Sequence, residues 1–369
     1  MPPSSNPISS TCVLLYQAVC KASSQQPLVL TILAACPLFT SPRVIPVILQ
    51  ATLAFSVTGF LIILVTLVFL KQQSQHATVL FDTSGTSGWD TGTAWFLGLT
   101  NSMYAFTSTD AAIHIAEEMV HPEKRLPQVL NMTLGIGFVT AFPLLLVMML
   151  SMTDVTRVIS ATLPYGELFM QITGSKIVTT FLMSWVTLVL FSALIGQWVT
   201  CGRLAWAFAR DGGLPYSHFF AHVNKRLAFP VRTTILALLF SCCYGLLYLV
   251  STTAFNSIIT SAVLFSNISY CIPQAIVAFR DRAVVLPQRA FDLGLIGRIC
   301  NYLAPVFVTV LAALVCFPPE LPVTSTNINY TPVILVGFWA GIIVMWRVLR
   351  KGFKGPQIDW EVLKSTKVT

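Results

Sequence analysis

The stretch Trp95–Gln128, WFLGLTNSMYAFTSTDAAIHIAEEMVHPEKRLPQ, starts as an apolar membrane helix and becomes polar in its middle. The polar side chains of this middle are Thr100, Asn101, Ser102, Tyr104, Thr107, Ser108, Thr109 and Asp110. The stretch then ends in an acidic pair, Glu117–Glu118, followed by the basic pair Lys124–Arg125. Polar groups are costly in lipid, so such a segment normally faces protein or water. A membrane helix interrupted in this way is typical of a transporter that binds its solute near the middle of the bilayer.

The composition is that of an integral membrane protein. Hydrophobic residues make up 55% of the 369-residue chain, charged residues 10%, and the mean hydropathy is +0.76. A soluble globular chain carries roughly 25% charged residues. The net charge of +8 comes from basic residues between apolar runs and in the tail, which membrane topology explains better than nucleic-acid binding. We therefore expect the chain to lie in a lipid bilayer and to bind no nucleic acid.

The apolar runs predict an all-α integral membrane fold with about nine transmembrane helices, at roughly 20 residues for each crossing. The predicted spans are residues 27–40, 44–70, 94–116, 129–151, 177–202, 231–250, 254–279, 299–317 and 331–349. Gln197 in the fifth span and Asn267 and Tyr270 in the seventh are polar groups that need partners in lipid. We expect these three side chains to line a polar path between the helices.

The basic residues assign the two sides of the membrane. The loops on one side and the C-terminal tail hold 16 basic residues, whereas the opposite loops hold 3. Because cytoplasmic loops carry the excess of Lys and Arg, we expect the tail in the cytosol and loop 318–330 outside. Nine spans with a cytosolic C-terminus place the N-terminus outside, and three additional upstream spans would return it to the cytosol.

Asp110, His114 and Glu117 have i, i+4, i+7 spacing, which places all three on one face of an α-helix. Two carboxylates and an imidazole can ligate a metal or relay protons. The same three residues can instead form a polar stripe that is hydrogen-bonded to neighbouring helices. No CxxC pair, HExxH motif or credible Ser/His/Asp set occurs, so we expect no metal site, no cofactor and no enzyme activity.

Four runs of sequence carry a resemblance to a known family. Asp110–Glu118, DAAIHIAEE, resembles the DAxxHxxEE stretch of the amino acid/choline transporter family, within the amino acid–polyamine–organocation superfamily. The runs WAFARDGGLP at 206–215 and FPVRT at 229–233 agree with it. The run CFPPELPVTSTNINY at 316–330 is similar to a signature of the fungal choline/GABA permease branch. The resemblance extends in unbroken order from about Ser41 to Gln357.

This resemblance implies a twelve-helix fold with two inverted five-helix repeats, in which the first and sixth helices are discontinuous and share the substrate. The predicted spans then correspond to helices four to twelve, and the first three helices are expected to be missing. The expected parts are a short polar N-terminus (1–26), two helices of the first repeat (27–70), a complete second repeat (94–279), two C-terminal helices (299–349) and a cytosolic tail (350–369).

The resemblance also implies where substrate lies, against an unwound middle of the sixth helix at about Thr100–Thr109. Tyr104 and Phe106 can offer π faces to an ammonium group, or can pack between helices. The substrate-binding candidates are Thr100, Asn101, Tyr104, Phe106, Thr107, Asp110, Gln197, Asn267 and Tyr270. The candidates for gating or proton coupling are Asp110, His114, Glu117, Glu118, Arg210 and Asp211.

Together these features predict a secondary active transporter for a small cationic or zwitterionic nitrogenous solute, such as choline, GABA, an amino acid or a polyamine. Family analogy favours alternating access, proton coupling and a multi-pass location in the plasma membrane. The alternative is a truncated, non-transporting remnant of such a permease, or an incomplete gene model of one.

Overall fold

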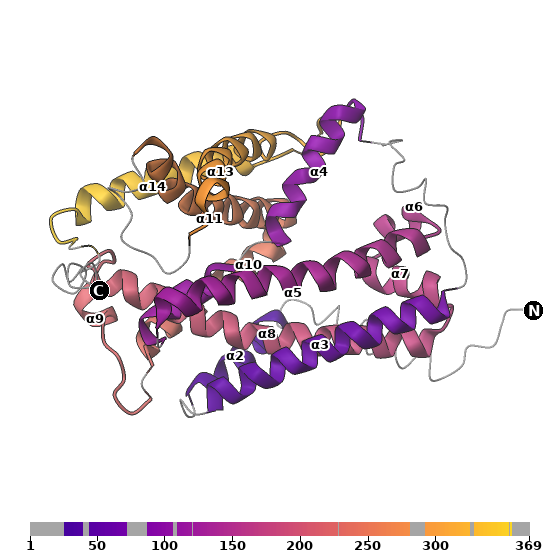
Figure 1. Cartoon of the computed structure of the whole chain (residues 1–369), viewed down its shortest axis with the longest axis horizontal. Helices are drawn as coiled ribbons and strands as arrows, with labels where there is room; N and C mark the ends of the chain where they lie inside the picture. The colour runs from indigo at the N-terminus through magenta and orange to yellow at the C-terminus, as the bar shows by residue number, and fades with distance from the viewer. Residues whose placement is uncertain are drawn as a thin grey trace, which may run out of the picture.

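The structure is a computed structural model that describes residues 26–39, 44–71, 87–105, 109–119, 121–227, 229–280, 292–324, 328–353 and 355. Seven helices in this part are long and apolar enough to cross a membrane. They are α3 (Val44–Leu70), α5 (Pro122–Ser151), α8 (Lys176–Arg210), α10 (Val231–Val250), α11 (Thr252–Phe279), α13 (Gly294–Leu314) and α14 (Thr331–Leu349). Figure 1 shows them as the long rods of the molecule. The predicted all-α membrane fold is confirmed.

The other two predicted spans are interrupted rather than continuous. Residues 27–40 contain α2 (Gln26–Ala35) followed by the 3-10 helix η1 (Cys36–Phe39). Pro37 lies at this junction, and proline removes a backbone donor and disfavours a continuing α-helix. Residues 94–116 contain α4 (Thr91–Ala105) and the 3-10 helix η3 (Thr109–Glu118). With 10 residues in α2 and 15 in α4, neither helix alone reaches the roughly 20 residues of a crossing.

Short helices connect the long ones. α6 (Val155–Ser160) is capped by Asp154, whose carboxylate accepts from the Arg157 amide at 3.0 Å. α7 (Pro164–Thr173) has Pro164 in its first turn and ends at Gly174, which is left-handed with φ 63°. α9 (Ser217–Phe220) follows α8. Of these three, α7 also packs into the interior, because its Leu168, Phe169 and Ile172 belong to a buried apolar cluster shared with α3 and α8.

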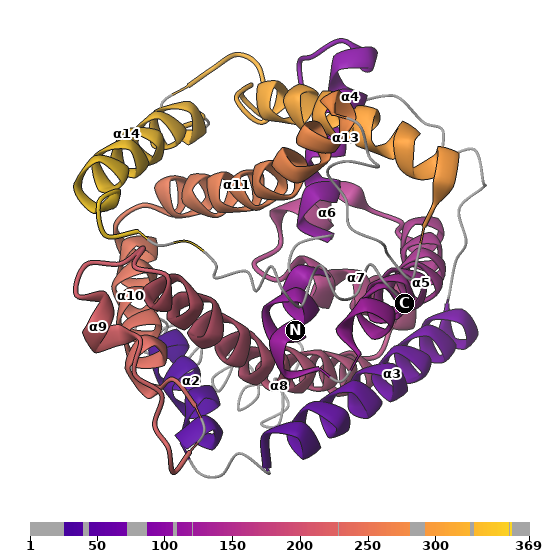
Figure 2. The same ribbon diagram turned by 60° about the vertical axis from the view of Figure 1, so that its left-hand side comes forward.

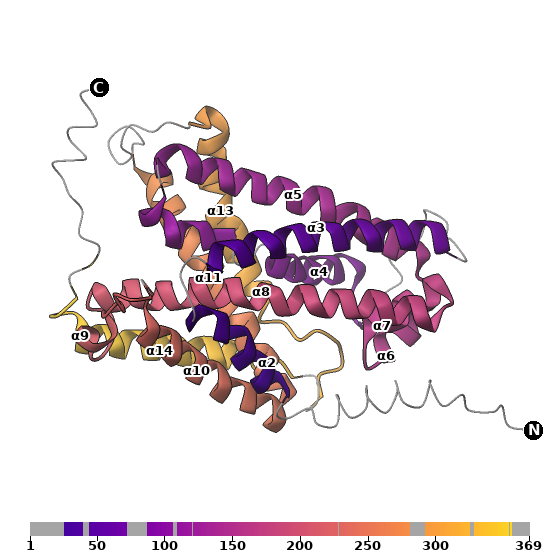
Figure 3. The ribbon, with the colours of Figure 1, turned by 90° about the horizontal axis from the view of Figure 1, so that it is seen from below.

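α8 is the helix around which the first half of the chain packs. It contacts α2, α3, α7 and α10, and Figure 3 shows α3 and α8 running side by side. At Gly202 the α8 backbone approaches α10 so closely that the Thr233 hydroxyl donates to the Gly202 carbonyl at 2.9 Å. Thr233 and Thr234 are fully buried there. Small residues and an interhelical hydrogen bond are the usual means of packing helices in lipid.

A second group of helices forms around α11. α11 packs against α13 and α14, and α4 packs against both α11 and α13. The centre of this group is a buried apolar cluster of Met103, Val263, Leu264, Leu311 and Val315. Figure 2 shows α11, α13 and α14 on one side of the molecule and α3 and α8 on the other. The described residues thus form two helix groups that meet at α10 and along the α4–η3 segment.

The Gly202 contact gives a stability prediction. A Cβ at position 202 would lie 2.2 Å from the Thr234 hydroxyl oxygen, so Gly202→Ala forces α8 and α10 apart. We expect a loss of about 1–3 kcal/mol from overpacking, which exceeds the gain of about 1 kcal/mol from replacing a helical glycine. The melting temperature of the purified protein in detergent measures the effect.

Gly137→Ala in α5 is the matched control, because nothing lies within 4 Å of its Cβ position. It should leave the melting temperature unchanged or raise it. Equal melting temperatures for Gly202→Ala and Gly137→Ala would contradict the close approach of α8 and α10.

Candidate functional site

The interrupted segment α4–η3 is the feature on which a candidate site can be built. α4 ends at Ala105, η3 begins at Thr109, and residues 106–108 lie outside the described part of the structure. The prediction of an unwound stretch from Thr100 to Thr109 is wrong for residues 100–105, which are α-helical. The second arm is a 3-10 helix of 10 residues, and 3-10 runs longer than about 4 residues are uncommon outside hinges and strained sites.

Two contacts place the interruption along α11. The Tyr104 hydroxyl lies 2.5 Å from the Thr260 hydroxyl, which itself donates to the Asn256 carbonyl, so Tyr104 is the donor to Thr260. Beyond the interruption, Asp110 interacts with the hydroxyl of Tyr270. Thr260 and Tyr270 are about 15 Å apart along a helix with a rise of 1.5 Å per residue. They lie on either side of the midpoint of α11, so the interruption lies beside the middle of a membrane-spanning helix.

The first residues of η3 carry a coupled acid–base pair. His114 Nε2 lies 2.9 Å from Asp110 Oδ2, and both side chains are 21% exposed. Tyr270 joins the pair, and its hydroxyl accepts a hydrogen bond from Ser266 at 2.8 Å. A carboxylate, an imidazole and a phenol in contact can hold a proton or orient an ammonium group. The prediction that Glu117 shares one helix face with Asp110 and His114 assumed an α-helix, and η3 is a 3-10 helix. The side chains of Glu117 and Glu118 lie outside the described part of the structure.

A pocket of about 590 Å³ opens on the α4 side of the interruption, between α4, α11 and the α13–α14 connection. It is called the outer pocket because the basic residues of the sequence predict that this connection lies outside. It brings together three sequence-predicted residues, Thr100, Asn101 and Tyr104. The Thr100 hydroxyl is already bonded to the Leu97 carbonyl at 2.6 Å, so it adds less to the pocket than the other two. The pocket also has polar lining residues that are not among the substrate-binding candidates listed above: Ser87, Thr252, Thr253, Asn256, Ser257, Thr260, Glu320 and Asn329.

A second, inner pocket of about 640 Å³ lies between α11 and α13. It contains the predicted residues Asn267 and Tyr270, together with Gln274, Asp292 and Asn301. Val263 and Leu264 of the buried cluster lie on α11 between the residues that line the two pockets. Five of the sequence-predicted residues are therefore divided between two pockets, and Asp110 and His114 line neither.

Other predicted residues are not brought to either pocket. Gln197 is exposed on α8 and lines neither. Arg210 and Asp211 contact each other at 3.4 Å at the end of α8, as a local pair between chain neighbours. Phe106 and Thr107 lie outside the described residues.

The residues that the candidate list missed carried a partial signal. Asn256 and Thr260 recur with helical spacing on the same apolar span as Asn267, which sequence alone shows. Glu320 lies within the run 316–330 that carries the family resemblance. Nothing local in the sequence indicates that these positions face α4, because that contact joins segments more than 150 residues apart.

Comparison with known proteins places the chain among membrane permeases. A family model described as amino acid permease matches residues 28–339. The choline transporter of Saccharomyces cerevisiae is 32% identical over 308 residues, which cover 82% of this chain and 54% of that protein. The transmembrane transporter swnT of Metarhizium robertsii is 29% identical, over 85% of this chain and 63% of that protein. An amino-acid permease of Arabidopsis thaliana is 29% identical, over 70% of this chain and 52% of that protein. The chain thus spans between half and two thirds of these relatives.

The contact between α4 and α11 gives a testable prediction. Tyr104→Phe and Thr260→Val each remove one hydroxyl of the same hydrogen bond, so their effects on the free energy of unfolding should not add. We expect a coupling energy of about 0.5–1.5 kcal/mol, as found for hydrogen bonds between membrane helices. Reversible unfolding of the single and double variants in mixed micelles measures it.

The control cycle pairs Tyr104→Phe with Thr309→Val. Thr309 lies on α13 and its hydroxyl bonds to the Pro305 carbonyl of its own helix at 2.7 Å. This cycle should be additive. A coupling energy of zero for Tyr104 and Thr260 would contradict the hydrogen bond that places the interruption beside α11.

Proposed function

We propose that this chain, which belongs to the amino acid permease family, acts in a secondary transporter that carries a small nitrogenous solute across a membrane. The observation that carries the proposal is the position of the α4–η3 interruption. It lies beside the middle of α11, with Tyr104 before it and the Asp110–His114 pair after it. Helices broken near the bilayer centre form solute sites because their ends expose backbone groups and polar side chains.

The chemistry beside the interruption favours a solute with an ammonium group. Beyond the interruption, Asp110 offers a carboxylate beside the aromatic ring of Tyr270, and these are the two kinds of group that recognise organic cations. Asn101 and Asn256 in the outer pocket add amide groups that can bond to a hydroxyl or carboxylate of the solute. Since one of its relatives is a choline transporter, choline is the first compound to test, followed by GABA, amino acids and polyamines.

Transport by alternating access is the mechanism that this arrangement supports best. α4 packs against α11 and α13, whereas η3 packs against α5 and α8. The interruption therefore joins the two helix groups, and a change of angle there would open the site to one side or the other. We place the C-terminal tail in the cytosol and the protein in the plasma membrane, on the strength of its basic loops.

Uptake by reconstituted protein tests the function. The full chain is placed in proteoliposomes and uptake of labelled choline, GABA, lysine and putrescine is compared with empty liposomes. Saturable uptake of at least one compound, which unlabelled compound competes away, is the expected result. Uptake equal to that of empty liposomes for the whole panel would contradict the proposal.

The Asp110–His114 pair makes a specific prediction for proton coupling. We expect an inward proton gradient to stimulate uptake by the wild type. In His114→Gln the imidazole that exchanges protons is lost, so exchange of solute without a gradient should persist while the stimulation disappears.

His121→Gln is the matched control, because His121 is 71% exposed and pairs only loosely with Glu123 at 3.5 Å. It should keep the stimulation. If His114→Gln responds to the gradient as the wild type does, the pair has no part in coupling.

A further inference from the structure

The connection between α13 and α14 forms a wall of the outer pocket, and the proposed transport does not by itself explain its contacts. Its described residues are 315–324 and 328–330. The Leu321 amide donates to the Ser87 carbonyl at 2.8 Å, and the Trp89 indole donates to the Pro318 carbonyl at 3.1 Å. Gly88 has φ 77°, and a Cβ there would lie 2.6 Å from the Leu321 carbonyl oxygen. The connection is thus fastened to the start of α4.

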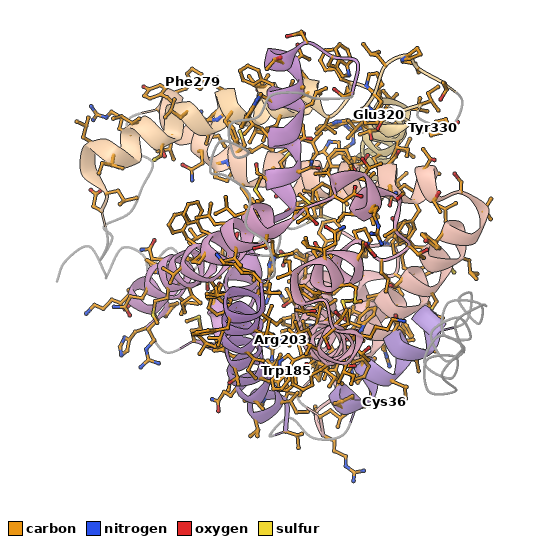
Figure 4. All side chains as sticks on the ribbon, turned by 90° about the vertical axis from the view of Figure 1, so that its right-hand side faces the viewer. Cys36, Trp185, Arg203, Phe279, Glu320 and Tyr330 are labelled. Carbon is orange, nitrogen blue, oxygen red and sulfur yellow. The ribbon has the colours of Figure 1, made fainter. Side chains whose placement is uncertain are left out.

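The Asn329 side chain joins the two ends of the same connection by hydrogen bonds. The Asn329 amide donates to the Val315 carbonyl at 2.7 Å and to the Phe317 carbonyl at 2.8 Å, and its oxygen accepts from the Thr331 amide at 2.9 Å. These bonds hold the two ends of the connection together at the pocket. Figure 4 shows Glu320 and Tyr330 close together in the upper part of the view, with Arg203 in the lower part.

The pocket carries negative charge. Among the described residues that line it, Glu320 is the single charged one, and none of them is Lys, Arg or His. Among the described residues, Glu320 has no ion-pair partner. Ser87 also lines the pocket, and its hydroxyl oxygen is buried with no hydrogen-bond partner in the described part of the chain. A carboxylate without a counter-ion and an unused hydroxyl are groups that a ligand can satisfy.

The helix N-termini at the pocket do not make it a site for anions. Helix N-termini attract anions through their free amides, and α4, α11 and α14 all begin there. At each of these N-termini one amide of the first turn is already bonded to a side chain. Asp90 accepts from the Thr93 amide at 3.1 Å, Ser251 from the Ala254 amide at 3.1 Å, and Asn329 from the Thr331 amide. Hydrogen bonds from Thr93 also lower the pKa of Asp90, so this cap is a second fixed negative charge beside the mouth.

We propose that the outer pocket is a first binding station for an organic ammonium ion, held by the Glu320 carboxylate and the Tyr104 ring before it reaches the Asp110–His114 side of the interruption. The volume of about 590 Å³ accommodates a molecule of this size with part of its water. The assignment rests on the proposed permease function. The role of Glu320 is to concentrate cations at the mouth and to reject anions.

Equilibrium binding to the full chain in lipid nanodiscs tests the station. Two probes are compared: choline, and its uncharged isostere 3,3-dimethylbutan-1-ol. For Glu320→Gln we expect choline binding to weaken about fivefold, the loss typical of a partly exposed ion pair, with binding of the isostere unchanged. Added salt should weaken choline binding to the wild type and have less effect on the variant. Glu320→Lys should weaken choline binding further.

Glu167→Gln is the matched control. Glu167 lies on α7 and pairs with Arg157 at 3.2 Å, so it changes the charge of the protein equally without lining the pocket. It should bind choline as the wild type does. Unchanged melting temperatures show that the variants fold.

The outcomes separate the station from the transport function. Equal choline affinities for wild type and Glu320→Gln overturn the station, even if proteoliposomes take up choline. Glu320-dependent binding without uptake supports the station and refutes transport. If the wild type binds neither choline nor putrescine, the station is overturned as well.

Discussion

The constraint on which this structure depends is that backbone polar groups inside a bilayer must find partners. α4 is α-helical to Ala105 and η3 is a 3-10 helix from Thr109, and backbone groups at a helix end need partners from outside the helix. Each such group costs several kcal/mol if it faces lipid. The interruption must therefore lie against protein or water. α11 supplies the protein surface, with Thr260 and Tyr270 facing the two arms.

This arrangement also explains how the two helix groups are connected. The first arm is fixed to α11 and α13 by the buried side chain of Met103, and the second arm lies against α5 and α8. Much of the remaining surface is apolar and faces outward, for example Phe138 at 67% and Val139 at 66% exposure on α5. Such a surface suits lipid and gives no binding specificity. The polar contacts are concentrated along α4, η3 and α11, where a solute would pass.

Much of this could be predicted from the sequence, and the exceptions have physical reasons. Long apolar runs predicted nine spans, and seven of these are continuous helices in the described part of the chain, because length and hydropathy suffice to recognise most membrane spans. The polar residues between Thr100 and Asp110 predicted an interruption, but not its position, since Tyr104 keeps α-helical geometry. Neighbouring residues alone do not decide where a helix unwinds.

The composition of the outer pocket was harder to predict. Glu320 and Tyr104 line the same pocket although 215 residues lie between them in the sequence. The hydrogen bonds that join their segments, from Trp89 to Pro318 and from Leu321 to Ser87, also span more than 200 residues. Hydrophobic periodicity carries no information on such pairings. Gln197 shows the converse, because a polar residue in an apolar span suggested a site, yet its side chain reaches neither pocket.

The most direct test of the central claim is the solvent accessibility of a spin label at position 104 in a bilayer. The label is attached to Tyr104→Cys in a chain without native cysteines and compared with a label at Val139→Cys on the apolar surface of α5. Thr260, the partner of Tyr104, lies roughly 8 Å from the middle of α11 at 1.5 Å per residue, well within the hydrocarbon region. The account predicts that the label at 104 collides with a water-soluble paramagnetic reagent while the label at 139 collides with oxygen. An oxygen-dominated profile at both positions would mean that the interruption faces lipid, and would contradict the account.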